Sequence, residues 1–83
     1  MIDKRADAIA RGNHAQAILE SPIMQDAFRH IEDDLIERWK HAKTVEAREE
    51  CWRMLDSAAR LRSYLLSAAS NGKLTQQMVN RNV

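Results

Sequence analysis

The chain has 83 residues, 13 basic and 12 acidic side chains, and a single cysteine. This length suits one small domain, the lone Cys51 excludes an intrachain disulfide, and the near-neutral charge argues against strong nonspecific nucleic-acid binding. Many Ala, Leu, Glu, Arg and Gln residues favour helix. The sequence shows no signal peptide and no stretch long enough to span a membrane. We therefore expect a soluble, cytoplasmic, all-α protein with a single domain over residues 1–83.

The first predicted helix covers about residues 3–19. It is rich in alanine, and its larger apolar side chains are spread around the helix axis. Gly12 and Asn13 are expected to weaken its middle, because both residue types disfavour helix. Pro22 requires this helix to end, because a proline disfavours helical geometry at the residue before it.

The second predicted helix covers about residues 22–41. Ser21 is a good N-cap, and Pro22 suits the first helical position. Larger apolar residues then recur at spacings of three and four, which is the pattern of an amphipathic helix. These residues are Met24, Phe28, Ile31 and Leu35.

The third predicted helix covers about residues 45–70, with Thr44 as its N-cap. The connector before it is short, so the second and third helices are expected to form an antiparallel hairpin. Asn71 and Gly72 are expected to end the helix, because glycine readily takes the left-handed conformation of a C-cap. Residues 73–83 would then be a short or frayed tail.

The apolar face of the third helix covers more than half of its circumference. One antiparallel neighbour needs a stripe only a little wider than about 100°. The extra width is available to the first helix or to a second copy of the chain. Three residues spaced by seven form an additional stripe, the heptad edge, along one side of this face. They are Trp52, Ala59 and Leu66. The sequence therefore predicts a homo-oligomer.

Arg62 lies near the centre of the same apolar face. Its stem could pack on the core while the guanidinium reaches water. A buried arginine needs a carboxylate or several carbonyl groups instead. Glu20 is the nearest local candidate, and an acidic residue of a second chain or of a partner protein is the alternative. We expect Arg62 to pair with a carboxylate across a helix–helix or subunit contact.

Patterns for catalysis and metal binding are weak. Asp26, His30 and Asp34 share one helix face at a spacing of four, which can hold a divalent metal, but no second helix offers matching ligands. A solvated surface with an Asp34–Arg38 pair is favoured. Cys51 lies on the apolar face, and no histidine is marked as its base, so a buried structural thiol is expected. We expect no enzyme activity, no metal and no cofactor.

Charge is distributed unevenly along the chain. Acidic residues gather in the second helix, and after Asp56 every charged side chain is basic. The basic residues of this end are Arg60, Arg62, Lys73 and Arg81. Such an end can make a weak phosphate contact or a head-to-tail subunit contact. The alternative function is therefore a nucleic-acid-binding component of DNA packaging or regulation that uses these four residues.

A set of short sequence features lies between about residues 18 and 74. They are the Leu-x-Ser-Pro helix start (Leu19, Ser21, Pro22), Ala27-Phe28, Ile31-Glu32, Ile36, Trp39, Arg48-Glu49, Trp52, Leu61-Arg62 and Gly72-Lys73-Leu74. This pattern resembles a family of small helical proteins encoded by tailed bacteriophages and prophages. The resemblance implies a phage setting, often near head and packaging functions, and it brings no catalytic residues. The first helix is the least typical part.

The favoured function is a non-enzymatic protein–protein interaction factor that self-associates and binds another protein. The binding residues are expected at Trp52, Ala59, Arg62 and Leu66, along the edge of the broad face. In a phage setting, the partner would be a phage or host protein in the host cytoplasm. The role would be virion assembly, packaging or host takeover, with no membrane involved.

Overall fold

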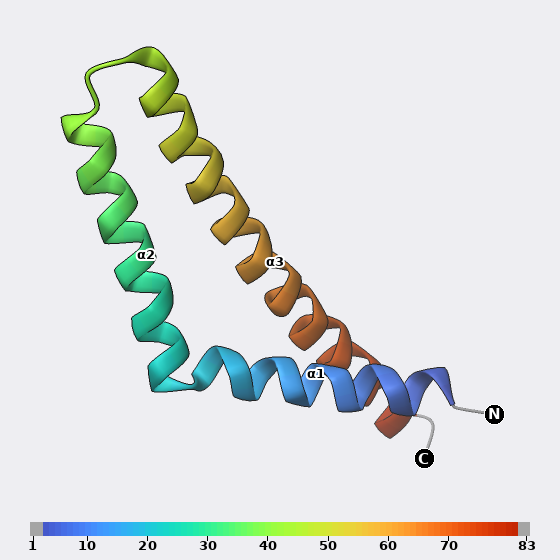
Figure 1. The fold of residues 1–83 in the computed structure, drawn as a ribbon. Helices are drawn as coiled ribbons and strands as arrows, with labels where there is room; N and C mark the ends of the chain where they lie inside the picture. Colours follow the sequence, from blue (N-terminus) through green and yellow to red (C-terminus); the bar gives the residue numbers. More distant parts are fainter. Residues whose placement is uncertain (1–2, 82–83) are drawn as a thin grey trace.

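The computed structural model describes residues 3–81, which form three helices and no strand (Figure 1). Helix α1 spans Lys4–Glu20, α2 spans Pro22–His41 and α3 spans Val45–Arg81. The predicted all-α class is confirmed. None of these helices combines the length and apolar character needed to cross a membrane, as far as the described residues go.

The helix starts follow from side-chain capping. The Asp3 carboxylate accepts a hydrogen bond from the backbone N–H of Arg5 at 3.0 Å. Ser21 Oγ accepts from the N–H of Met24 at 3.4 Å, and Thr44 Oγ1 accepts from that of Ala47 at 3.1 Å. Each bond satisfies an N–H group that has no partner inside its helix. The caps predicted at residues 21 and 44 are therefore present.

The end of α3 differs from the prediction. The helix does not stop at residue 70 but continues through Asn71 and Gly72 to Arg81. Neither glycine of the described chain has a positive φ, so Gly72 does not form a left-handed cap. Thr75 Oγ1 donates to the carbonyl of Asn71 at 2.8 Å within the helix. The tail expected over residues 73–83 is thus helical up to residue 81, and residues 82–83 lie outside the described part.

Gly72 is needed for packing rather than for termination. A Cβ atom at Gly72 would lie 2.7 Å from the Cα of Gly12 and 3.1 Å from the carbonyl oxygen of Ala8. Reciprocally, a Cβ at Gly12 would lie 2.7 Å from the Cα of Gly72 and 2.9 Å from the carbonyl oxygen of Ala68. The backbones of α1 and α3 therefore touch at this point, the glycine crossing. Gly12 does not interrupt α1, contrary to the weak middle expected from its helix propensity.

The three helices outline an open triangle (Figure 1). Helices α2 and α3 lie side by side with antiparallel chain directions and are joined by the connector at residues 42–44. Helix α1 meets α2 at Ser21 at a large angle and crosses α3 near the end of α3 that is far from the connector. The extents are 60 × 24 × 22 Å, with a radius of gyration of 17.6 Å. A compact domain of this length has a radius of gyration of about 12 Å. The chain is therefore elongated.

The core is small for the number of apolar side chains. The buried hydrophobic residues are Ala15, Phe28, Leu35, Cys51 and Ala69. No side chain in the described part falls below 2% exposure, and twelve large hydrophobic side chains are at least 42% exposed. A core of this size supplies no more than roughly 3–5 kcal/mol of stability. Much of the apolar surface is thus left uncovered within one chain.

Candidate interaction surface

Two tryptophans meet on the hairpin near the connector. Ile36 and Trp39 of α2 and Trp52 and Leu55 of α3 line an almost wholly apolar pocket. Trp39 is 49% and Trp52 is 63% exposed. Tryptophan is rarely left this open without a partner, because its ring buries more apolar area than other side chains.

The same side of the hairpin continues toward α1. Its second pocket is lined by Leu19, Gln25, Phe28, Arg29, Glu32, Arg62 and Leu66. On α3 the residues of this side recur at spacings of three and four, which keeps them on one face of the helix. We call this surface the tryptophan face. It comprises Ile36, Trp39, Trp52, Leu55, Ala59 and Leu66, with Glu32 and Arg62 between them.

Arg62 has found a partner on α2. Its Nη1 atom lies 3.0 Å from Oε1 of Glu32, and its guanidinium carbon lies 4.6 Å from the centre of the Phe28 ring. The predicted pairing across a helix–helix contact is therefore seen. The expected candidate, Glu20, was wrong, since it accepts a hydrogen bond from Gln16 Nε2 at 2.8 Å instead. Glu32 follows Phe28 by one helical turn, so the ring and the carboxylate hold the guanidinium together.

This ion pair sits within the tryptophan face and is only half covered. The Arg62 and Glu32 side chains are 41% and 38% exposed. In that setting solvent screens the pair, and its net contribution to the free energy of unfolding is about 1 kcal/mol or less. Covering it with another protein surface would desolvate both charges. Their mutual pairing would then be needed to make that burial tolerable.

The other residues predicted for association are open in the described structure. Trp52, Ala59 and Leu66 of the heptad edge are all exposed. The four basic residues of the alternative do not gather. Arg60 pairs with Asp56 at 2.9 Å, and it lies two positions from Arg62, which places the two arginines on nearly opposite sides of α3. Lys73 and Arg81 are exposed.

The acidic face of α2 and the thiol of Cys51 lie in different surroundings. Asp26, His30 and Asp34 are exposed, as expected. Asp34 pairs with Arg38 at 3.4 Å, and this predicted pair is confirmed. Within residues 3–81 no three His, Cys, Asp or Glu side chains are placed to share a metal ion. Cys51 is buried on α3.

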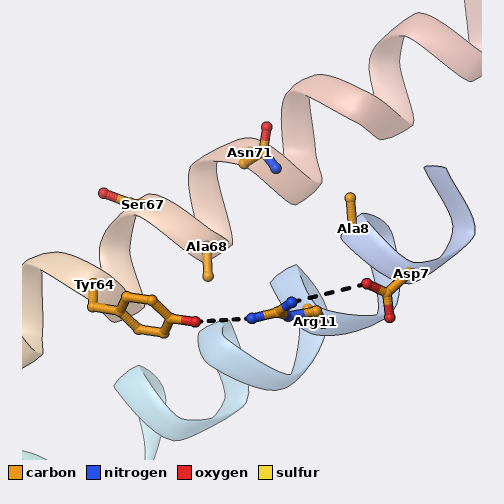
Figure 2. A pocket seen from close by; sticks show the side chains of 7 residues that line it. All are labelled: Asp7, Ala8, Arg11, Tyr64, Ser67, Ala68 and Asn71. Atoms are coloured by element: carbon orange, nitrogen blue, oxygen red, sulfur yellow. Dashed lines mark hydrogen bonds and ion pairs between the residues drawn. The ribbon is translucent and has the colours of Figure 1, made fainter. Parts of the chain in front are cut away.

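A polar cleft beside the glycine crossing was not predicted. Figure 2 shows its lining, which consists of Asp7, Ala8, Arg11, Tyr64, Ser67, Ala68 and Asn71. Arg11 Nη2 donates to the Tyr64 hydroxyl at 2.8 Å, and Nη1 lies 3.9 Å from Asp7. Ser67 and Asn71 point away from the guanidinium (Figure 2). The hydrogen bond between Arg11 and Tyr64 therefore joins α1 to α3 at this cleft. The spacing of Asp7 and Arg11 was a visible signal, but nothing in the sequence pointed to Tyr64.

No protein-family model, curated protein or solved structure matches this chain. The resemblance to small phage-encoded proteins over residues 18–74 stays a prediction.

Proposed function

We propose that this protein is a non-enzymatic protein–protein interaction factor that self-associates and binds through the tryptophan face. One observation carries the proposal. Both tryptophans of the chain lie half open on one continuous side of the hairpin, at the mouth of an apolar pocket. Contiguous apolar surface of this kind marks interaction sites, and tryptophan and arginine are the residues that dominate binding energy at such sites.

The composition of the face suits protein recognition. Aromatic and aliphatic side chains surround the Glu32–Arg62 pair, so an apolar area encloses a small polar spot of fixed geometry. Apolar area supplies affinity, while the paired charges reject a partner surface that cannot match them. The phage setting follows from the resemblance over residues 18–74 alone. There, the protein would serve in virion assembly, packaging or host takeover.

We place nucleic-acid binding second. Two of its four residues, Arg60 and Arg62, are engaged by carboxylates of the same chain, which leaves less positive charge for phosphates. Nucleic-acid affinity that depends on phosphate contacts falls steeply with salt, whereas association through an apolar face changes little. Titrating labelled duplex DNA at low and high salt separates the two functions.

Sedimentation equilibrium across micromolar concentrations tests the proposal. We expect a mass above the 9.6 kDa of one chain, and we expect Trp52→Ala to lower it. Ile23→Ala is the matched control, because Ile23 is 77% exposed on the opposite side of α2 and its loss should leave the mass unchanged. A mass of 9.6 kDa at every concentration would contradict the proposal, and salt-sensitive DNA binding would then favour the alternative function.

A further inference from the structure

We propose that the tryptophan face is covered by a second copy of the chain, with the two α3 helices packed antiparallel about a two-fold axis at Ala59. This inference rests on the proposed self-association. It adds the identity of the occupant, the direction of the helices and their register.

The accessible surface of the chain argues for an occupant of considerable size. The surface measures 6800 Å² for a mass of 9.6 kDa. A compact monomer of that mass exposes about 5,100 Å². The excess of about 1,700 Å² per chain is within the range that obligate dimers bury, about 1,000–2,500 Å² from each partner. A second copy supplies a surface of this size and chemistry, because the same open face is present on it.

The sequence of the heptad edge fixes the register. Ala59 lies midway between Trp52 and Leu66, seven residues from each. Two α3 helices that cross antiparallel at Ala59 therefore place each Trp52 against Leu66 of the second copy. The small side chain at the axis lets the backbones approach closely, and the large rings fill the space on either side. The same symmetry sets Asp56 of each chain at the height of Arg62 of the other along the helix axes.

The glycine crossing lies on a different side of α3 from the heptad edge. Helix α1 meets α3 through Gly72, Ala68 and their neighbours. Counted at 3.6 residues per turn, Gly72 lies about a third of a turn around α3 from Leu66. The crossing therefore leaves Trp52 and Ala59 open to a second α3. At Leu66, Leu19 of α1 lines the same pocket, so a second copy would meet both helices there.

Charge favours the antiparallel direction. The first part of α3, residues 45–56, contains four acidic and two basic side chains. These are Glu46, Glu49, Glu50 and Asp56 with Arg48 and Arg53. From residue 57 to the end of the chain all four charged side chains are basic. An antiparallel pair sets the acidic part of each helix beside the basic part of the other, whereas a parallel pair sets like charges together.

Pulsed electron–electron double resonance, which measures distances between spin labels, tests the direction and register of the two α3 helices in the full chain. The variants carry one spin label each, in place of Gln77 or Ser57, in a Cys51→Ala background checked by circular dichroism and sedimentation. Both positions are exposed. Gln77 lies 18 residues from Ala59, so the two labels of an antiparallel dimer are separated by about 54 Å along the helices. The labels at residue 57 are expected within about 25 Å of each other, because they lie within one turn of the axis.

A second pair of variants tests the axis itself. Ala59→Arg places a long charged side chain at the axis and should weaken association at least tenfold, while helicity is retained because Ala59 is exposed within the chain. Ser57→Arg is the matched control on the other side of α3 and should leave association unchanged. Equal association of the two variants would overturn the inference.

The outcomes separate this inference from the function on which it rests. A dimer in which the residue 77 labels lie within about 20 Å means parallel helices or another face, so the inference fails and self-association stands. A chain that stays monomeric at every concentration removes both.

Discussion

The two contacts that α3 makes within the chain are built in opposite ways. At the glycine crossing, Gly12 of α1 meets Gly72 of α3, and both residues are buried. In the hairpin, α3 meets α2 through large side chains. At the crossing the two backbones touch, because neither glycine has a side chain. The hairpin buries Phe28 and Leu35 at its centre and leaves the tryptophans at its side exposed. The first contact is thus complete in one chain, and the second still presents apolar surface to a partner.

The two contacts should also respond to mutation in opposite ways. Backbone contact at the crossing gains dispersion energy and offsets the roughly 1 kcal/mol that each glycine costs in a helix. Added atoms are harmful there, because the backbones cannot move apart cheaply. The hairpin depends on a few large buried side chains, so removed atoms are harmful there.

The largest effect is expected in the centre of the hairpin. Phe28 is buried, and its ring carries the Arg62 guanidinium. Phe28→Ala should cost about 3–5 kcal/mol in the free energy of unfolding, a large share of the stability of so small a chain. Urea denaturation followed by circular dichroism measures it. Ile31→Ala, at a position 45% exposed on the same helix, is the control and should cost much less. Equal midpoints for the two variants would mean that the register of α2 on α3 is wrong.

The second-largest effect is expected at the glycine crossing, where the sign of the stability change shows whether the two helices touch. Gly72→Ala would stabilise an ordinary helix by about 1 kcal/mol. At the crossing the new Cβ would lie 2.7 Å from the Cα of Gly12, so we expect a destabilisation of about 1–3 kcal/mol. Thermal melts of Gly72→Ala and of the exposed neighbour Asn71→Ala give the comparison. A higher melting temperature for the Gly72 variant would show that the helices do not touch there.

A smaller effect is expected at the ion pair. Arg62→Ala removes both the contact with Phe28 and the charge beside Glu32, and should cost about 1 kcal/mol. Arg62→Leu refills part of the volume and removes the charge that association would desolvate, so folding should survive with a smaller loss. The measurement is urea denaturation beside sedimentation, with Arg60→Ala as control. If Arg62→Ala changes neither folding nor association, Arg62 only packs its stem and extends to water.

The smallest expected effect is that of a chelator. Asp26, His30 and Asp34 are exposed, and two of them already have arginine partners. Excess EDTA should therefore leave the melting temperature unchanged. A drop of several degrees would reveal a metal that holds the fold.

The sequence predicted what local chemistry controls. The Ser21 and Thr44 caps, the limits of α2 and the apolar stripe with Phe28 and Leu35 follow from capping and from helical spacing. It misled at Gly12 and Gly72, where helix propensity indicates a weak point and a stop. Only the meeting of two segments sixty residues apart gives those glycines their role. The spacing of Ala8 from Gly12 and of Ala68 from Gly72, four residues in each case, was the available signal.

The partner of Arg62 shows the same limit. Its position in an apolar face predicted a carboxylate, but the choice between Glu20 and Glu32 depends on how α2 and α3 align along their length. The exposure of the tryptophan face was likewise visible as excess width on α3. Its extent onto α2, at Ile36 and Trp39, required the structure.

The most direct test of the account is the environment of the two tryptophans, because the chain has only Trp39 and Trp52 and both lie on the tryptophan face. Intrinsic fluorescence and acrylamide quenching should be measured on the full chain from nanomolar to high micromolar concentration. If the face is covered by association, the emission shifts to the blue and quenching weakens as concentration rises, in parallel with the rise in sedimenting mass. Emission and quenching that stay those of open tryptophans at every concentration would show that the face is never covered, and would contradict the account.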